Sequence, residues 1–429
     1  MADLSINMAG IKSPNPFWLA SAPPTNSGAQ IQRAFDLGWG GAVWKTLGEQ
    51  IINVNSRFWA MDYAGSRMMG LNNIELITAR PWETNIREII ETKKKYPKNA
   101  LVVSLMIESK RESWHAAVKE VNDTGCDGIE LNFGCPHGMS ERGMGAAVGQ
   151  VPEYTKMITE WVMEVAKVPV LVKLTPNVTN PAIVGRAAKA AGANGISLIN
   201  TINSIMGINL DTFSPNPSVQ GKGSHGGYCG PAVKPIALNM VSACASDREI
   251  GIPVSGIGGI STWQDAVEFM LVGATSVQVC TAVMHHGYRI VEDMIDGLNN
   301  WMDEKGYANC SAFIGKALPN ICDWGDLNLN YRIIAKINPK LCIGCDLCHV
   351  AAWDGSHQCI DLDPHNGNRV PIVNEPECVG CNLCMLVCPV DGCITMEEQD
   401  TGKPPMSWRQ YQAELAKNPH CEKPGILEH

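Results

Sequence analysis

The sequence predicts an α/β fold, a parallel (β/α)8 barrel followed by a small α+β domain, and three observations carry that prediction. Short apolar runs recur between Phe17 and Thr281, and segments with the pattern of amphipathic helices lie between them. Most of the runs end on a polar residue. Cysteines crowd toward the C-terminal part of the chain, where the composition changes abruptly at Pro339.

The composition sets the class of protein. The 429 residues suffice for one large domain and an appendage, and 45% of them are hydrophobic, so a substantial core can form. The 34 basic and 43 acidic residues leave a net charge of -9, which argues against nucleic acid or an anionic membrane as partner. The N-terminus has no basic or apolar signal, and no apolar run reaches the roughly 18 residues of a membrane span. We therefore expect a soluble, cytoplasmic protein.

Eight runs are apolar on both faces, as strands buried in a parallel sheet are. They span residues 17–21, 42–46, 101–106, 128–132, 168–174, 195–200, 253–257 and 276–281. Between them lie helical segments, several of which open with proline or a capping residue. These segments span residues 30–37, 81–95, 113–123, 152–166, 181–191, 231–245 and 262–271. Eight alternations favour a closed barrel over the alternative, a doubly wound open sheet.

The polar residues at the ends of the runs also favour the barrel. In a barrel the carboxyl ends of all strands converge on one face, whereas an open sheet would scatter some of them. The residues concerned are Ser21, Lys45, Asn132, Lys173, Asn200, Gly258 and Thr281. We expect the functional site at this face.

Two insertions, 51–77 and 201–230, interrupt the alternation. Loops of this length in a compact domain are usually binding loops or lids. The composition divides the whole chain into a barrel (1–310), a connector (311–338), a cluster-binding domain (339–398) and a polar tail (399–429), to which we assign no function.

Two copies of a cysteine motif indicate that the C-terminal domain is ferredoxin-like. They are Cys342-x2-Cys345-x2-Cys348 and Cys378-x2-Cys381-x2-Cys384-x3-Cys388-Pro389. This spacing is typical of two 4Fe-4S clusters, in which the fourth cysteine of one motif ligates the other cluster. A structural zinc site is the alternative, but the Cys-Pro ending favours iron–sulfur. The odd total of 17 cysteines in a large chain also argues for ligation rather than disulfides.

One ligand is missing from the expected pattern, because Ala352 stands where the first motif would have its fourth cysteine. The expected ligands of the first cluster are Cys342, Cys345, Cys348 and Cys388. Those of the second are Cys378, Cys381, Cys384 and, as substitute, Cys359, with Cys393 as the next candidate. Alternatively, the second cluster has three irons, is labile or is absent.

Iron–sulfur clusters transfer single electrons, so a barrel connected to them needs a cofactor that accepts single electrons and delivers pairs, which a flavin does. The glycine-rich turn 255–260 precedes a helix that begins near Thr262, and its backbone N–H groups could cradle a flavin phosphate together with Cys280 and Thr281. A tight turn without a ligand is the alternative.

Other polar residues at the strand ends suit a polar ring system. Lys45 and Lys173 end apolar strands, where a charge is costly unless it meets an anion or a polar ligand. Donors and acceptors for an amide-like heterocycle come from Asn73, Asn132, Asn200 and Thr201. The alternatives are lysines whose ammonium groups reach solvent and asparagines that only stabilise turns.

Cys135 is the candidate catalytic residue. It lies in Asn132-Phe-Gly-Cys135-Pro-His-Gly138, where the fourth strand ends and a loop begins. A thiol with a pKa of about 8.5 is largely protonated at neutral pH and can donate a proton. The alternative is an ordinary buried thiol. The glycine-rich segment 138–149 could act as a lid over it.

These motifs together resemble the dihydropyrimidine dehydrogenases, most closely the FMN-carrying subunit of the bacterial NAD-dependent enzymes. The resemblance covers residues from about 4 to about 396 and rests on the run 132–145, on Lys173-Leu-Thr-Pro-Asn-Val, on Asn200-Thr201, on Ile257-Gly-Gly-Ile260 and on the tandem cluster motifs. It implies reduction of uracil or thymine to the 5,6-dihydropyrimidine, with hydride from FMN to C6 and a proton from Cys135 to C5.

The resemblance also implies a role for each matching residue. The implied FMN contacts are Ser21, Lys45, Thr46, Lys173, Gly230, Ile257, Gly258, Gly259, Cys280 and Thr281. The implied pyrimidine contacts are Asn73, Asn132, Gly134, Asn200 and Thr201. Relatives often carry serine at the position of Gly134, so a possible hydrogen bond to substrate is missing here.

No dinucleotide-binding fold precedes the barrel, so we expect electrons from NADH or NADPH to enter through a partner subunit. The resemblance makes that partner a protein with FAD and iron–sulfur clusters, and the assembly a homodimer within a heterotetramer. Two alternatives stay open. One is a dihydroorotate dehydrogenase, which shares the FMN barrel, and the other is an electron-transfer subunit without turnover of its own.

Overall fold

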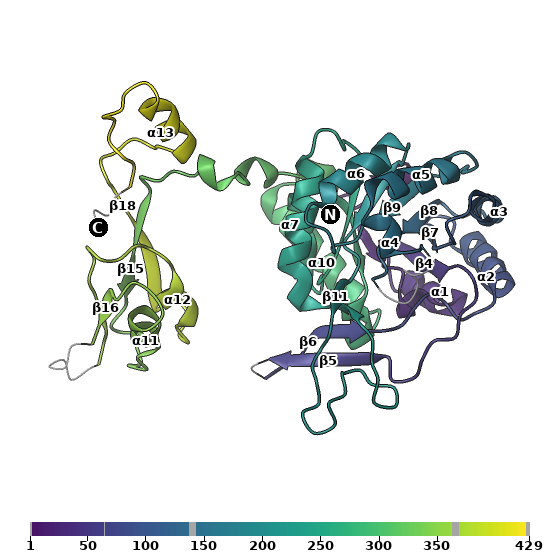
Figure 1. The fold of residues 1–429 in the computed structure, drawn as a ribbon, viewed down its shortest axis with the longest axis horizontal. Coiled ribbons are helices and arrows are strands. Elements are labelled where there is room, and N and C mark those ends of the chain that lie inside the picture. The colour runs from purple at the N-terminus through teal and green to yellow at the C-terminus, as the bar shows by residue number, and fades with distance from the viewer. Residues whose placement is uncertain (1, 64, 137–142, 363–368, 426–429) are drawn as a thin grey trace. The chain divides into compact units, whose positions relative to one another are not determined.

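The computed structural model describes residues 2–63, 65–136, 143–362 and 369–425. The chain forms two compact units, Met1–Pro319 and Asn320–His429. Figure 1 shows a first unit of helices around strands and a smaller second unit. No helix in the described parts of the chain combines the length and the apolar character that crossing a bilayer requires.

Eight parallel strands form a closed barrel in the first unit. They are β3 (Phe17–Leu19), β4 (Gly41–Leu47), β7 (Ala100–Leu105), β8 (Gly128–Asn132), β9 (Val170–Lys173), β10 (Gly195–Leu198), β13 (Val254–Ile257) and β14 (Ala274–Val279). Around the barrel the order is β10-β13-β14-β3-β4-β7-β8-β9, and each neighbouring pair is parallel. The predicted barrel is confirmed, and each of the eight predicted runs overlaps one of its strands.

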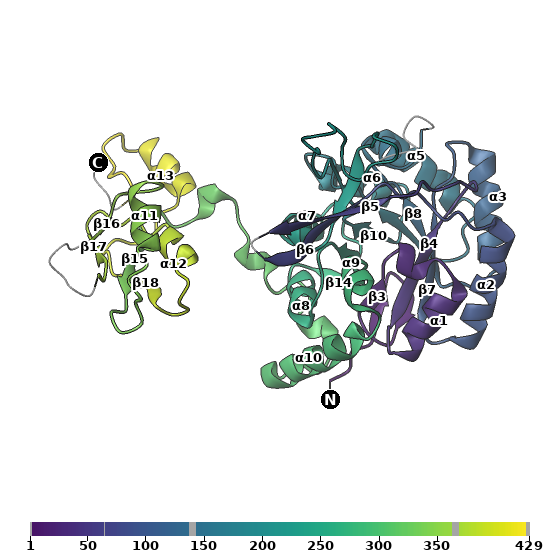
Figure 2. The same ribbon diagram turned by 90° about the horizontal axis from the view of Figure 1, so that it is seen from below.

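Helices surround these strands, as Figure 2 shows. They are α1 (Gly28–Asp36), α2 (Trp82–Lys95), α3 (Arg111–Asn122), α5 (Pro152–Met163), α6 (Pro181–Ala190), α7 (Lys234–Ser246), α8 (Trp263–Leu271), α9 (Thr281–His286) and α10 (Ile290–Lys305). Side chains of Ser27, Asn180 and Thr262 cap α1, α6 and α8 by accepting hydrogen bonds from backbone N–H groups. Thr281, expected as the last residue of the eighth strand, instead begins α9, because β14 ends at Val279.

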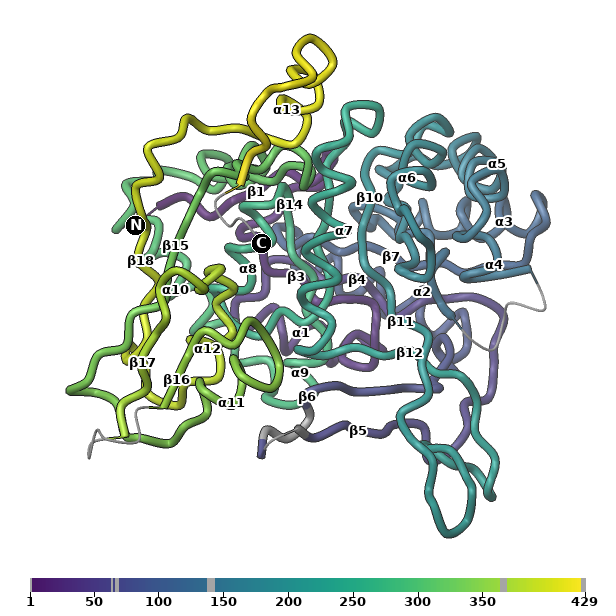
Figure 3. Tube along the Cα trace, turned by 60° about the vertical axis from the view of Figure 1, so that its left-hand side comes forward, coloured from purple at the N-terminus to yellow at the C-terminus, as the bar shows by residue number. Residues whose placement is uncertain are grey.

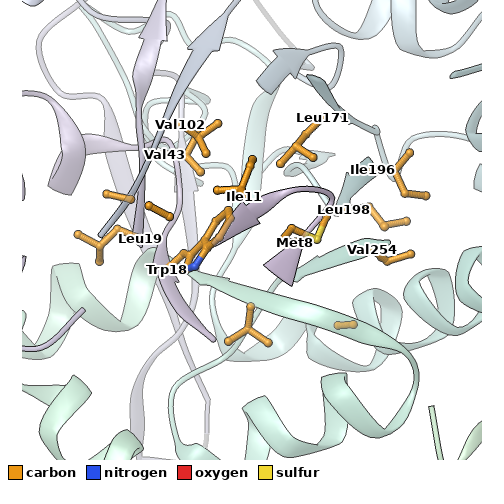
Figure 4. Packing of buried hydrophobic residues seen from close by; sticks show 14 of the residues in the cluster. Met8, Ile11, Trp18, Leu19, Val43, Val102, Leu171, Ile196, Leu198 and Val254 are labelled. Atoms are coloured by element: carbon orange, nitrogen blue, oxygen red, sulfur yellow. The ribbon is translucent and has the colours of Figure 1, made fainter. Parts of the chain in front are cut away.

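A short hairpin closes the amino end of the barrel. It consists of β1 (Ile6–Met8) and β2 (Ile11–Ser13). Met8 and Ile11 are buried, and Figure 4 shows them among apolar side chains of the barrel strands. Gly128 and Gly195 begin β8 and β10, and a Cβ added there would lie 2.5 Å from Ile11 Cδ1 and 3.0 Å from Met8 Cε. These strands begin with glycine because the hairpin fills the space that a side chain would occupy, and the carboxyl end of the barrel stays available for a site.

The two insertions were expected to be loops. They instead contain four strands, which form one sheet. Its strands are β5 (Phe58–Tyr63), β6 (Ser66–Asn73), β11 (Ile202–Ser204) and β12 (Gly226–Cys229), in the order β11-β12-β6-β5. The insertions meet where β12 pairs with β6, with Asn73 opposite Gly227 (Figure 3). One of the two strands beside β6 therefore comes from the second insertion, 154 positions away at Asn73 and Gly227, which local sequence patterns do not reveal.

In its described residues the second unit has two small antiparallel sheets and three α-helices. They are β15 (Arg332–Ile337), α11 (Leu347–Trp353), β16 (Ile360–Asp361), β17 (Ile372–Val373), α12 (Leu383–Val387), β18 (Ile394–Gln399) and α13 (Trp408–Leu415). Residues 332–337, assigned to the connector by composition, pair along their whole length with β18 as strand β15. The unit begins at Asn320 and includes the tail, because Asn328 pairs with Ser407 in a β-bridge.

Candidate functional site

A pocket opens at the carboxyl ends of the barrel strands. Its empty volume is about 1120 Å³, part of it open to solvent, slightly more than the roughly 300–1,000 Å³ of typical ligand sites. Its lining includes fifteen of the sixteen barrel residues predicted for the site: Ser21, Lys45, Thr46, Asn73, Asn132, Cys135, Lys173, Asn200, Thr201, Gly230, Ile257, Gly258, Gly259, Cys280 and Thr281. The exception is Gly134.

Gly134 is buried, and its part is to make room for Asn200. A Cβ added at Gly134 would lie 2.4 Å from Asn200 Cβ and 2.5 Å from Asn200 Nδ2. The Asn200 amide is thereby able to donate to Asn132 Oδ1 at 2.9 Å. A side chain at this position would collide with Asn200, so glycine is required here, and the substrate contact of Gly134 stays a prediction.

Hydrogen bonds to neighbouring groups of the protein hold the amide side chains in the pocket. Asn132 Nδ2 donates to Thr46 Oγ1 at 3.0 Å, and Thr46 Oγ1 lies 3.0 Å from Ser21 Oγ. Asn73 Nδ2 donates to the Gly227 carbonyl at 3.2 Å, which attaches it to the sheet of the insertions. Side chains locked in this way present fixed donors and acceptors to a ligand, so less entropy is lost on binding.

Cys135 lines the pocket, half-buried, just after β8. Its side chain packs against a small apolar cluster of Ile77, Met106 and Met144. Its backbone carbonyl accepts a hydrogen bond at 2.9 Å from the N–H of Ala146. The thiol thus stands at a pocket wall that is apolar on one side.

Part of the expected lid is a fixed wall. His137 and the rest of segment 137–142 lie outside the described residues. Beyond them the chain forms helix α4 (Ala146–Gly149), whose residues Ala146, Val148 and Gly149 are buried. A Cβ added at Gly149 would lie 1.9 Å from the Phe133 carbonyl oxygen. The expectation of a lid is therefore wrong for residues 146–149, because they pack against the strand end that carries Cys135.

Two lysines in the pocket are paired with carboxylates that the sequence did not reveal. Lys45 Nζ lies 2.8 Å from Glu75 Oε1, and Arg57 Nη1 lies 3.1 Å from the same oxygen. Lys173 Nζ lies 3.7 Å from Glu130 Oε1 inside the barrel. Glu75 and Glu130 are separated from their lysines by 30 and 43 positions, so no local motif identified them.

The residues after β13 form a cradle that only glycine permits. Gly258 and Gly259 have φ angles of 129° and 76°. A Cβ at Gly259 would lie 2.9 Å from Lys234 N and 3.0 Å from the Gly230 carbonyl oxygen. Backbone can approach a ligand closely at such positions, so the pocket fits a flavin phosphate here.

We expect Gly259→Ala to lower the FMN content of the purified chain at least tenfold, because the added Cβ collides with backbone and the residue must keep a left-handed conformation. Flavin released by heat and measured by fluorescence gives the FMN content. The matched control is Gly306→Ala, which has φ of 71° and no atom within 4 Å of its added Cβ. Equal FMN content in the two variants would contradict the cradle.

Two cavities of the second unit are lined by cysteines. The first is lined by Cys342, Cys345, Cys348, Cys388 and Cys393. The second is lined by Cys359, Cys378, Cys381 and Cys384. Cys388 reaches the first cavity although it belongs to the second motif, as crossed ligation requires. Cys359 stands in the second cavity beside Ala352, whereas Cys393, the next candidate for the missing ligand, stands in the first.

The chemistry of the second cavity fits an iron–sulfur cluster. Burial raises the pKa of the Cys359 thiol to about 12, and the neighbouring Cys378 adds to the shift. A thiolate there needs positive charge beside it, which cluster iron supplies. Among the described residues, no three His, Cys, Asp or Glu side chains converge as the ligands of a single metal ion do, whereas ligands of a cubane cluster are spread around it.

Residues 3–302 match the dihydroorotate dehydrogenase family, and residues 335–396 match the 4Fe-4S dicluster domain. The chain is 41% identical over 398 residues to the NAD-dependent dihydropyrimidine dehydrogenase subunit PreA of Escherichia coli K12, covering 92% of this chain and 96% of that one. The chain belongs to the dihydropyrimidine dehydrogenase family. It is an oxidoreductase, and the two matched families support iron–sulfur clusters and a flavin as its cofactors.

Two further relatives match a smaller share of the chain. The chloroplastic dihydropyrimidine dehydrogenase (NADP(+)) of Arabidopsis thaliana is 40% identical over 337 residues, 76% of this chain and 79% of that one. The catalytic subunit of dihydroorotate dehydrogenase B (NAD(+)) of Pyrococcus abyssi is 37% identical over 317 residues, 73% of this chain and 99% of that one. Dihydropyrimidine dehydrogenase PreA matches across both units, whereas the dihydroorotate dehydrogenase aligns with a stretch no longer than the barrel unit.

Proposed function

We propose that this chain reduces a pyrimidine base, uracil or thymine, to the 5,6-dihydropyrimidine. The observation that carries the proposal is that Cys135 and four amide or hydroxyl side chains line one pocket with the glycine cradle. The four side chains are Asn73, Asn132, Asn200 and Thr201. A pyrimidine base is a cyclic ureide with alternating C=O and N–H groups, and primary amides match such edges with one acceptor and two donors each.

In this proposal Cys135 protonates C5 of the ring. FMN, when bound, supplies the hydride that C6 receives, so the ring gains one hydride and one proton. The apolar contacts of Cys135 with Met106 and Met144 keep water from one side of the thiol, which favours transfer of its proton to the substrate. Asn132 and Asn200, bonded to each other, hold the ring in place for that transfer.

The cofactor contacts follow from the lining of the pocket. Lys45 and Lys173 would face the polar part of the flavin ring, and the phosphate would lie at the glycine cradle. The full set we propose for FMN is Ser21, Lys45, Thr46, Lys173, Gly230, Ile257, Gly258, Gly259, Cys280 and Thr281.

Two 4Fe-4S clusters complete the proposed electron path. The first would be ligated by Cys342, Cys345, Cys348 and Cys388. The second would be ligated by Cys359, Cys378, Cys381 and Cys384. We propose that electrons come from NADH or NADPH through a partner subunit with FAD and iron–sulfur clusters, in a heterotetramer containing two copies of this chain.

The test is anaerobic. The purified chain is reduced with dithionite, excess reductant is removed, and uracil, thymine or orotate is added while the flavin absorbance is followed. Reoxidation by uracil or thymine, with dihydropyrimidine formed in equal amount, is the expected result. A flavin that stays reduced with all three compounds would leave the chain as an electron-transfer subunit and overturn the proposal.

Dihydroorotate oxidation is the second candidate, favoured by the match of residues 3–302 to the dihydroorotate dehydrogenase family. Orotate differs from uracil by a carboxylate at C6, which requires a cation or several N–H donors in the pocket. Lys45 already pairs with Glu75 at 2.8 Å, which lowers its capacity to bind a further anion. Reoxidation by orotate alone would favour this candidate.

A further inference from the structure

A carboxylate lies inside the barrel, beneath the pocket. Glu130 is fully buried and stands on β8 two residues before Asn132, so both side chains point to the barrel interior. Glu130 is not among the residues that line the pocket. A buried charge is unfavourable unless it is paired and hydrogen-bonded, so the surroundings of Glu130 decide what it does.

Three other strands hold this carboxylate. Its Oε2 accepts hydrogen bonds from Ser197 Oγ on β10 at 2.8 Å and from Gln278 Nε2 on β14 at 3.0 Å. Its Oε1 faces Lys173 Nζ on β9 at 3.7 Å, and no described residue gives that oxygen a hydrogen bond. Neutral groups therefore hold Oε2 by hydrogen bonds, whereas Oε1 interacts with the ammonium group of Lys173.

The two lysines of the pocket differ in this respect. Lys45 Nζ is in direct contact with Glu75 at 2.8 Å, whereas Lys173 Nζ is 0.9 Å farther from its carboxylate. The longer distance leaves the N–H groups of Lys173 available to the pocket that this residue lines. The side chain of Lys173 is only 7% exposed, so solvent screens its charge little.

We propose that Glu130 is a positioning residue, which holds the Lys173 ammonium at the pocket floor and offsets its positive charge toward a bound flavin. This inference rests on the flavin of the proposed function. Reduction adds negative charge to a flavin, and an unopposed ammonium would stabilise that charge. Glu130 thus lowers the reduction potential of the flavin and limits how strongly the chain holds the reduced form.

Glu130→Gln tests this because it keeps the shape of the side chain and removes its charge. We expect the ratio of FMN affinities, reduced over oxidised, to rise at least tenfold, which corresponds to an upward shift of about 30 mV for a two-electron couple. The midpoint potential is measured by redox titration of the flavin band with the holoprotein. Ser197→Ala is the matched control, because it removes a hydrogen bond to the same carboxylate without removing charge, and it should leave the potential within about 10 mV of the parent, a twofold change in that ratio.

The double variant Glu130→Gln/Lys173→Met removes both charges. Its flavin potential should lie below that of Glu130→Gln and above that of Lys173→Met. If Glu130→Gln does not fold, the comparison of the double variant with Lys173→Met tests the effect of the Glu130 charge. An unchanged potential in the folded Glu130→Gln variant, or equal potentials in Lys173→Met and the double variant, would overturn the inference alone. A parent chain that binds no FMN would overturn the proposed function as well.

Discussion

Replacement of Cys135 by alanine is expected to slow pyrimidine reduction by about 10²- to 10⁴-fold, the range that one general acid contributes. The variant should still bind FMN, because Cys135 is not one of the proposed FMN contacts. It packs instead beside Ile77, Met106 and Met144. The proposed clusters should also be intact, since all of their proposed ligands lie in the second unit. Only the step that needs a proton at C5 is then affected.

The measurement is a stopped-flow experiment in which the reduced chain is mixed with uracil and the flavin absorbance is followed. Cys244→Ala serves as the control, because Cys244 is a buried thiol on the outer helix α7 and away from the pocket lining. A Cys135→Ala variant that reoxidises as fast as the Cys244→Ala control would exclude the thiol as proton donor.

Replacement of Cys359 by alanine is expected to lower the iron content from about eight to about four per chain, because the second cavity keeps only three thiols. A partly assembled three-iron cluster would give an intermediate value, and EPR of the reduced and oxidised chain separates the two cases. Loss of this cluster should also interrupt electron transfer from the partner subunit to the flavin, while dithionite still reduces the flavin directly.

The chain offers a matched rescue for this variant. Ala352 is buried and lines the same cavity from α11, so a cysteine there would point its thiol into the cavity. The double variant Cys359→Ala/Ala352→Cys should regain about eight irons per chain. Cys393→Ala, which alters the first cavity only, should leave the second cluster in place. A Cys359→Ala chain with full iron content would mean that another group is the fourth ligand.

Several features of this protein were determined by the sequence alone. The barrel could be predicted because its strands are buried on both faces, so each one appears as a short, mainly apolar run. The pocket residues could be predicted because parallel strands bring their carboxyl ends to one face, which places Lys45, Lys173 and Asn200 together whatever the loops do. The cluster motifs could be identified from spacing, since three thiols of each cluster come from one short segment.

Other features were decided only by the tertiary structure, because they depend on contacts between distant segments. The insertions form one sheet because β6 pairs with β12. The sequence of neither strand indicates this pairing. The close approach of Gly134 to Asn200 could not be read from the sequence. The lysine partners come from distant segments, Glu75 from the stretch after β6 and Glu130 from β8. The sequence left Cys359 and Cys393 as alternative ligands of the second cluster. In the structure Cys393, just before β18, lines the first cavity, whereas Cys359, after the turn that follows α11, lines the second.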